Sequence, residues 1–167
     1  WILFLNRDGS VRSHSKISST AGGFAGPLDD SDRFARGVAF PGDLDGDGTG
    51  DLAVGSPRDD DGGSTQSADR GALWLLYLRP DGSVKAEQKI SSTSGGFTGI
   101  LDNGDKFARA LAPLGDFDGN GTPDLVVGAY LDDDGGNARG AAWIVHLGGI
   151  PLVEPYGCGL NPTTSLT

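Results

Sequence analysis

The chain has 167 residues with a formal net charge of −10, and 37% of its residues are hydrophobic. This length suits one domain, and no apolar run approaches the roughly 18 residues of a transmembrane helix, so we expect no membrane span. The acidic balance disfavours nucleic acid as a partner, because phosphate backbones carry the same charge, and it favours cations.

Short apolar segments separated by Gly, Pro, Asp and Asn predict an all-β chain. In chain order, the first segments are Trp1–Leu5, Val11–Ser18, Phe34–Phe40 and Asp51–Gly55. No segment keeps apolar residues at helical spacing over ten residues without a Gly or Pro. We therefore expect helix only as isolated turns.

An internal repeat organises the sequence. Residues 1–57 align without a gap with residues 74–130, and 33 of these 57 positions are identical. A third copy begins at Trp143 and stops after Leu147. Four short strands in a unit of about 70 residues are typical of β-propeller blades with long loops.

The repeat predicts about two and a half blades. Residues 1–33 supply the third and fourth strands of one blade, residues 34–106 form a complete blade, and residues 107–147 begin another. A closed propeller needs about four blades or more, so we expect tandem four-stranded antiparallel blades that stay open within this chain. Residues 148–167, with the single cysteine Cys158, predict an extended tail in which Pro151–Tyr156 is a candidate fourth strand. The chain contains no Met, which indicates a processed product or a segment of a longer protein.

Two Asp-rich loops, residues 43–51 and 116–124, carry the clearest chemical signal. Oxygen ligands recur at positions 1, 3, 5 and 9, Gly at position 6 permits a sharp turn, and position 7 can add a backbone carbonyl. Such hard oxygens suit Ca²⁺, whereas Mg²⁺ needs stricter geometry and Zn²⁺ prefers His or Cys. We predict two Ca²⁺ ions per chain, with tighter binding at the first loop because it has four carboxylates and the second has three. The predicted ligands are Asp43, Asp45, Asp47, Thr49 and Asp51, and Asp116, Asp118, Asn120, Thr122 and Asp124.

Helical calcium loops match this sequence poorly. An EF-hand needs a bidentate Glu at position 12 and flanking helices. Position 12 is Val54 in the first loop and Val127 in the second, and each lies in a predicted buried strand. The same features exclude the helical dockerin module, and a single cysteine excludes cysteine-rich calcium repeats.

The loop and the strand after it resemble an FG-GAP repeat, the blade motif of integrin α-chain propellers and of many bacterial surface proteins. The resemblance covers the segment from Phe34 to Trp74 and its copy from Phe107 to Trp143. It implies a four-stranded blade whose Ca²⁺ loop joins the first two strands, and an extracellular adhesive or scaffold role. The name-giving Phe-Gly pair is Phe-Ala in both copies, which predicts a relaxed backbone approach at that point.

Several other residues favour structural roles. The equivalent residues Trp1, Trp74 and Trp143 are expected in the core between blades, although a sugar-stacking platform is an alternative. The Asp triplets 59–61 and 132–134 predict solvated turns, with a second cation site as the alternative. His14 and His146 occupy inequivalent places in the repeat, so the sequence predicts no catalytic His arrangement.

These features together predict a non-enzymatic, Ca²⁺-stabilised, extracellular β-propeller-repeat module. One alternative is a subunit of an extracellular fibre or ring that assembles by completing blades between copies. Another is a fragment of a secreted propeller enzyme. The expected partners are other copies of the chain or further blades of the same parent chain, and a surface protein or glycan as ligand.

Overall fold

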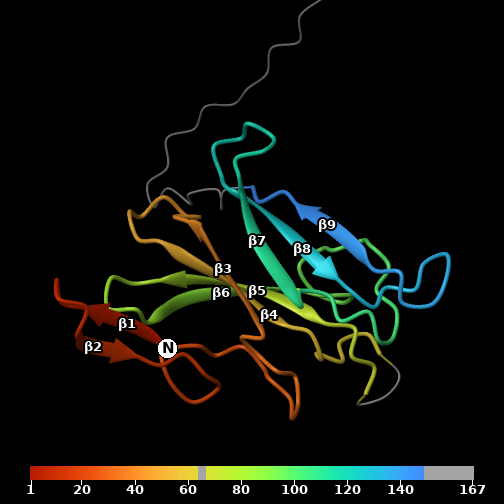
Figure 1. Cartoon of the computed structure of the whole chain (residues 1–167), viewed down its shortest axis with the longest axis horizontal. Coiled ribbons are helices and arrows are strands. Elements are labelled where there is room, and N and C mark those ends of the chain that lie inside the picture. The colour runs from red at the N-terminus through yellow and green to blue at the C-terminus, as the bar shows by residue number, and fades with distance from the viewer. Residues whose placement is uncertain (64–66, 149–167) are drawn as a thin grey trace, which may run out of the picture.

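The chain folds into three antiparallel sheets. The computed structural model describes residues 1–63 and 67–148, and in these residues all regular structure is β (Figure 1). This confirms the all-β prediction. The strands are β1 (Ile2–Leu5), β2 (Val11–Ser15), β3 (Gly37–Gly42), β4 (Asp51–Ser56), β5 (Ala72–Leu78), β6 (Val84–Ile90), β7 (Ala110–Gly115), β8 (Asp124–Ala129) and β9 (Ala141–Val145).

The sheets follow the predicted blade pattern. Strands β3 to β6 form a four-stranded meander, which we call blade 1. Strands β7 to β9 form a three-stranded meander, blade 2, and β1 pairs with β2 in an N-terminal half-blade. The three sheets lie side by side in chain order, and they form an open set (Figure 1).

Strand β5 explains how the blades stack. All seven of its residues are buried, because its alternate side chains face two different neighbours. Leu75 and Tyr77 pack in the core shared with blade 2, whereas Trp74 and Leu76 pack in the core shared with the half-blade. A strand covered on both faces needs this continuous apolar sequence.

The inner strands of the two blades begin three residues later than predicted. The predicted strands over 34–40 and 107–112 start at Gly37 and Ala110. Ala35 and Ala108, which replace the glycine of Phe-Gly, adopt left-handed backbone conformations with φ of 65° and 60°. These conformations form a turn and cannot continue a strand.

The predicted relaxation of the backbone at the Phe-Ala pair is wrong for the second copy, Phe107-Ala108. A Cβ atom placed on Gly55 of β4 would lie 1.9 Å from the carbonyl oxygen of Ala108. The turn before β7 therefore presses directly on β4 of the neighbouring blade. Only a glycine at position 55 permits this approach.

The equivalent tryptophans differ in burial. Trp74 is 2% exposed and meets Phe24 edge to face at 5.1 Å, and Trp143 meets Phe97 in the same way at 5.1 Å. The core prediction is confirmed for these two residues. It is wrong for Trp1, which is 72% exposed because no sheet covers that face of β1 within the described residues.

The prediction of solvated turns at the Asp triplets is wrong for their first residues. Asp59 and Asp132 are buried. Lys89 of β6 forms ion pairs with Asp59 at 2.7 Å and with Asp61 at 2.8 Å. Burial raises the pKa of the Asp59 carboxyl, and the bonded Lys89 ammonium opposes that shift.

The predicted tail over residues 148–167, with its candidate strand Pro151–Tyr156, lies outside the described residues except for Gly148. No helix in the described part of the chain has the length and apolar character needed to cross a membrane.

Candidate metal centre

The first Asp-rich loop joins β3 to β4 and is organised around Asp43. The Asp43 carboxylate accepts backbone N–H bonds from Gly46 at 2.8 Å, Asp47 at 3.2 Å and Gly48 at 2.7 Å. These bonds, led by the one from Gly48, lower the pKa of Asp43. Gly46 and Gly48 have φ of 77° and 85°, which is why the turn needs glycine at both positions.

Asp51 fastens the loop to the blade. Its buried carboxylate accepts N–H bonds from Leu44 of the loop at 2.8 Å and from Leu78 at the end of β5 at 2.9 Å. Burial raises the pKa of Asp51, and these two backbone bonds oppose the shift. The loop conformation is thereby linked to the end of the central strand.

Three carboxylates of this loop converge. Oxygen atoms of Asp43, Asp45 and Asp51 all lie within 4.8 Å of one another. The Oδ1 atom of Asp45 is buried and has no hydrogen-bond partner among the described residues. A buried carboxylate oxygen without a partner is costly, and a hard cation would satisfy it. The donor set therefore fits a divalent cation that prefers oxygen.

The remaining predicted ligands of the first loop lie beside this group. The Asp47 carboxylate accepts the backbone N–H of Thr49 at 2.7 Å and bonds to the Lys85 ammonium. Asp47 is not one of the three converging carboxylates. The structure thus brings together Asp43, Asp45 and Asp51, with Asp47 and Thr49 at the rim.

Lys85 of β6 is a member of the site that the sequence did not reveal. Its ammonium lies 2.8 Å from Asp45 Oδ2 and also contacts Asp47 Oδ2. Burial opposes its charge, but bonds to the two carboxylates outweigh that effect and raise the pKa of Lys85. A metal ion in this loop would compete with this ammonium for the Asp45 carboxylate.

The second loop, between β7 and β8, repeats this construction. Asp116 accepts N–H bonds from Gly119 at 2.8 Å, Asn120 at 3.0 Å and Gly121 at 2.9 Å. Asp124 accepts N–H bonds from Phe117 at 2.8 Å and from Leu147, just beyond β9, at 2.9 Å. Asp116 and Asp124 thus bond to the repeat equivalents of the residues that Asp43 and Asp51 bond in the first loop.

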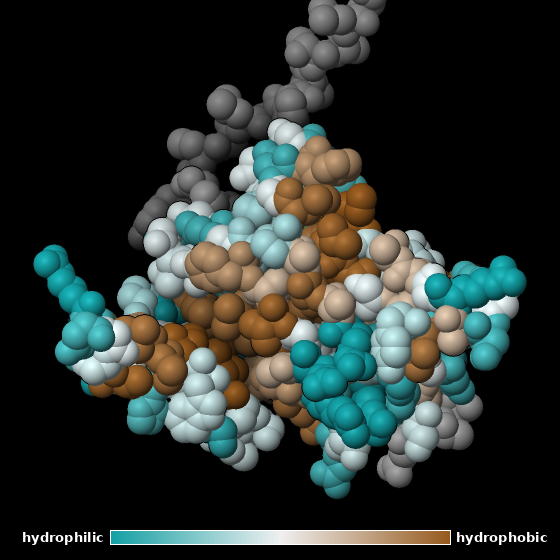
Figure 2. All heavy atoms as spheres, in the orientation of Figure 1, coloured by the Kyte–Doolittle hydropathy of each residue, from teal (hydrophilic) through white to brown (hydrophobic). Residues whose placement is uncertain are grey.

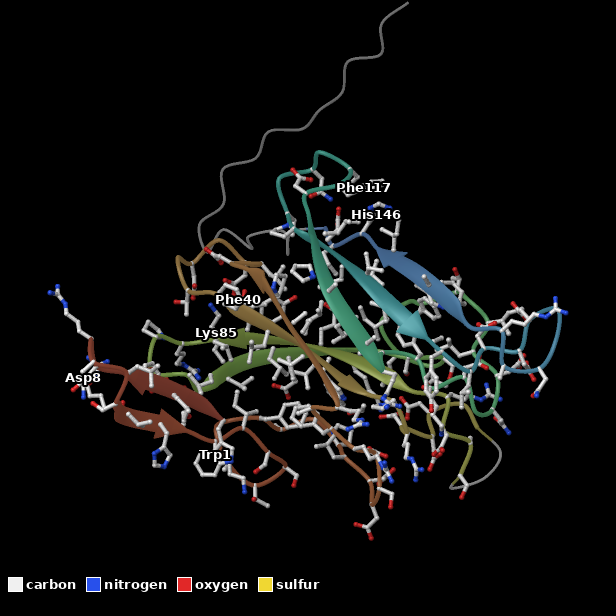
Figure 3. All side chains as sticks on the ribbon, in the orientation of Figure 1. Trp1, Asp8, Phe40, Lys85, Phe117 and His146 are labelled. Carbon is white, nitrogen blue, oxygen red and sulfur yellow. The ribbon has the colours of Figure 1, made fainter. Side chains whose placement is uncertain are left out.

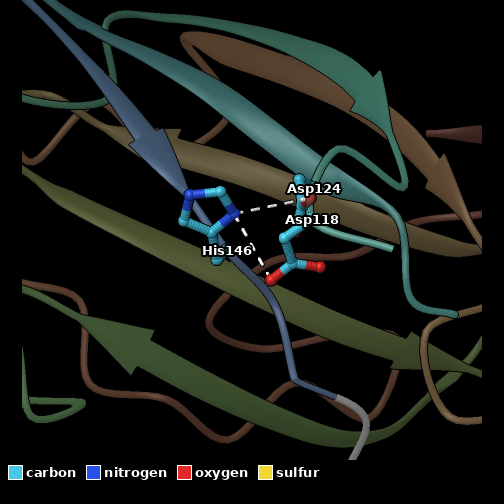
Figure 4. A group of neighbouring side chains, drawn as sticks. All are labelled: Asp118, Asp124 and His146. Carbon is cyan, nitrogen blue, oxygen red and sulfur yellow. Dashed lines mark ion pairs between the residues drawn. The ribbon is translucent and has the colours of Figure 1, made fainter. Parts of the chain in front are cut away.

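The converging group of the second loop contains a histidine. Nδ1 of His146 lies 3.6 Å from Asp118 Oδ2 and 3.6 Å from Asp124 Oδ2 (Figure 4). These three residues form the second cluster with metal-ligand geometry in the described chain. Figure 3 places His146 beside Phe117, and their ring centroids are 6.0 Å apart. Sequence reasoning assigned no role to His146 because its repeat equivalent is Tyr77.

Asn120 is committed to the loop backbone. Its Oδ1 accepts the Thr122 N–H at 2.7 Å, and its Nδ2 donates to Asp118 at 3.1 Å and to the Leu147 carbonyl at 3.0 Å. The Asn120 amide donates to Asp118, as the Lys85 ammonium donates to the equivalent Asp45 in the first loop.

Comparisons with known proteins agree with the repeat. The FG-GAP repeat model matches residues 34–76 and 107–145. The chain is 34% identical over 128 residues to integrin alpha-5 of Xenopus laevis, which covers 77% of this chain and 11% of that protein. It is 38% identical over 106 residues to integrin alpha-PS2 of Drosophila melanogaster, covering 60% of this chain and 7% of that protein. For integrin alpha-IIb of Homo sapiens, the identity is 32% over 98 residues, covering 59% and 8%.

Proposed function

The chain belongs to the FG-GAP repeat family, and on that basis we propose that it is a non-enzymatic, calcium-binding blade module of an extracellular adhesive or scaffold protein. It spans about a tenth of the length of the integrin α chains that it matches. Two observations carry the proposal: the carboxylates of Asp43, Asp45 and Asp51 converge, and the buried Oδ1 atom of Asp45 lacks a hydrogen-bond partner among the described residues.

Calcium is the cation that suits the first loop best. The site offers oxygen atoms from several carboxylates in a Gly-rich turn, and Ca²⁺ accepts six to eight such oxygens in irregular geometry. We propose one Ca²⁺ at each loop, two per chain. At the second loop the bound ion would draw on Asp116, Asp118 and Asp124, and His146 lies next to two of these carboxylates.

The proposed role of the ion is structural. Asp51 and Asp124 tie their loops to the ends of β5 and β9 through backbone bonds at 2.9 Å. An ion that neutralises the converging carboxylates would hold each loop in place against the strand to which it is bonded. The same bonds occupy the carboxylates that an acid–base mechanism would use, which supports a non-enzymatic role.

Titration calorimetry with Ca²⁺ tests the proposal. We expect two ions per chain for the wild type and one for Asp45→Ala, since this change removes the unpartnered oxygen. Asp8→Asn is the matched control, because Asp8 is an exposed carboxylate in the β1–β2 turn and bonds to Ser10. Failure of the wild-type chain to bind at millimolar Ca²⁺ would overturn the proposal.

The second candidate function is assembly of copies through their end faces. Leu3 and Leu5 of β1 are 54% and 55% exposed, and Trp1 just before β1 is 72% exposed, whereas the equivalent residues of β5 are at most 5% exposed. Figure 2 shows apolar side chains on the β1–β2 sheet. At the other end, Ile144 of β9 is 48% exposed, although its equivalent Leu75 is buried. The equivalent faces of β5 are covered by neighbouring sheets within the chain. A second copy could cover the two end faces in the same way, in a head-to-tail arrangement.

Variants at the two ends test the assembly. Light scattering of the Ca²⁺-loaded chain should show oligomers, and Leu3→Lys and Ile144→Lys should each abolish them. A mixture of the two variants should form a dimer, because each retains one intact face. A dispersed wild-type monomer of 17.1 kDa would overturn the proposed assembly.

A further inference from the structure

Five cationic side chains surround one small pocket at the seam between the blades. Arg33 and Arg36 precede β3, Lys106 and Arg109 precede β7, and Arg58 follows β4. The Asp-rich loops lie at the opposite ends of β3 and β7, so this pocket is separate from the metal centre. Figure 2 shows a broad hydrophilic patch over the region where β3 and β7 begin.

The pocket concentrates positive charge on a chain whose net charge is −10. Among the described residues, Asp69 is the one carboxylate in ion-pair contact with this group, and it serves both Lys106 and Arg58, the latter at 3.8 Å. In the same part of the chain, Arg33, Arg36 and Arg109 have no carboxylate within 4.0 Å. By contrast, Lys85 and Lys89 each have two acidic partners.

Local structure holds these side chains around the pocket. Arg33 and Lys106, equivalent in the repeat, adopt left-handed conformations with φ of 57° and 56°, which a non-glycine residue adopts at a cost. The guanidinium of Arg109 lies 4.9 Å from the ring centre of Tyr130, which restrains its position. The Arg36 N–H donates to the Gly55 carbonyl at 3.2 Å, and Gly55 lies against the Ala108 carbonyl, so the two turns that carry the cations are held close together.

We propose that this pocket binds a tetrahedral oxyanion, sulfate or phosphate, as a free ion or as an ester group on a glycan. Guanidinium groups donate paired N–H bonds in a geometry that matches such oxyanions. The pocket has a volume of about 50 Å³. Because one water molecule needs about 10–15 Å³, this volume holds a few water molecules or one oxyanion group. The negative charge of the whole chain repels a long polyanion, so a single oxyanion group is the ligand that fits.

The site goes beyond the proposed calcium binding and does not depend on it. Its experiments therefore use the Ca²⁺-loaded chain, and Asp45→Ala should bind the oxyanion with unchanged affinity. If calcium binding fails while sulfate binds, only the proposed function is lost. If sulfate binding fails in a chain that binds calcium, only the anion site is lost.

Titration with sodium sulfate and sodium phosphate at constant ionic strength, followed by backbone amide NMR, tests the proposal. Saturable shifts should centre on the turns that carry Arg33, Arg36 and Arg109. Arg36→Gln and Arg109→Gln should each weaken binding about tenfold or more, because each removes a charged hydrogen bond to the ligand. Arg12→Gln is the control, since Arg12 is exposed on β2 and its loss changes the net charge equally.

A second arm separates the two sources of the oxyanion. N-acetylglucosamine 6-sulfate should bind more tightly than inorganic sulfate if a glycan ester is the ligand, and more weakly if the free ion is; unsulfated N-acetylglucosamine should not bind. The wild-type shifts keep the proposal testable even if a variant does not fold. Absence of saturable shifts at these turns, or equal affinity in Arg36→Gln, Arg109→Gln and Arg12→Gln, would overturn the site.

Discussion

At the scale of single residues, we expect Lys85 to limit the affinity of the first loop for the proposed Ca²⁺. Its ammonium bonds to Oδ2 of Asp45 and to Oδ2 of Asp47, so its positive charge opposes a cation that enters beside the unpartnered Oδ1 of Asp45. The loop has one more carboxylate than the second loop, but Lys85 offsets one of those charges. The number of carboxylates predicts that Ca²⁺ binds more tightly to the first loop than to the second. Whether it does so depends on how strongly the Lys85 charge opposes the ion.

Replacing Lys85 tests this competition. We expect Lys85→Gln to tighten Ca²⁺ binding at the first loop about tenfold, which corresponds to about 1.4 kcal/mol, because the competing charge is removed. Calorimetry with Asp118→Ala in the background isolates the first site. Lys16→Gln, an exposed residue of the half-blade, is the control with the same change in charge. Weaker binding in Lys85→Gln would show that Lys85 supports the loop more than it competes.

The negative charge of Asp32 opposes folding. Burial raises its pKa from 3.8 to about 6, and its Oδ1 atom is buried without a hydrogen-bond partner among the described residues. Its Oδ2 accepts the Asp29 N–H at 2.8 Å. Between these two pKa values the folded chain binds more protons than the unfolded chain, so the contribution of Asp32 to stability falls as pH rises from about 4 to about 6.

Asp32→Asn removes this dependence and keeps the carbonyl oxygen for Asp29. We expect the variant to be more stable than the wild type at pH 7 by about 1–2 kcal/mol, with the difference vanishing below pH 4. Urea denaturation across this pH range measures it. Asp8→Asn should show the opposite sign, because bonds from Ser10 lower the pKa of Asp8 and its charge favours folding. A pH-independent difference for Asp32→Asn would contradict the argument.

At the scale of elements, the contact between β4 and the turn before β7 determines how the blades stack. Gly55 lies against the Ala108 carbonyl, whereas a Cβ atom added to its repeat equivalent Gly128 would lie at an ordinary 3.5 Å from Ala110 Cβ. The two glycines share their sequence context, because each follows an Asp-Leu-x-Val segment. Substituting each of them by Ala therefore compares the loss of stability at the contact between the blades with the loss at an open position.

We expect Gly55→Ala to destabilise the chain by about 1–3 kcal/mol, because the added methyl group must push the neighbouring blade away. Gly128→Ala should cost much less within a monomer. Urea denaturation at saturating Ca²⁺ compares the two. Equal costs in a monomeric sample would show that the seam is looser than its geometry indicates.

The sequence predicted the elements well and their contacts less well. Short apolar segments and the repeat placed the strands within a few residues, because these signals are local. The turns at Ala35 and Ala108 were missed since Ala rarely adopts a left-handed conformation, and the contact of Ala108 with Gly55 of the neighbouring blade cannot be read from the sequence. Lys85 and His146 approach the loops from β6 and from beyond β9, and sequence spacing contains no information on such distant pairs.

At the scale of the whole molecule, the loops and the sheets form one linked structure. Asp51 and Asp124 connect each loop to the end of a central or final strand by N–H bonds from Leu78 and Leu147. Collapse of a loop would therefore remove support from β5 or β9, the strands that carry Trp74 and Trp143. Cation binding at the loops should stabilise the blades as well as the loops themselves.

Removal of calcium measures this link. An ion that binds only the folded chain stabilises it by RT ln(1 + [L]/Kd), about 2.7 kcal/mol at a hundredfold excess over Kd, and two sites would double that amount. We expect EDTA to lower the Tm of the wild-type chain by several degrees and to lower that of Asp45→Ala by about half as much, because one site remains. Asp8→Asn should respond as the wild type does, since its carboxylate belongs to the β1–β2 turn and to neither loop. Differential scanning calorimetry provides the values, and a Tm that EDTA leaves unchanged in a chain shown to bind Ca²⁺ would mean that the unfolded chain binds the ion equally well.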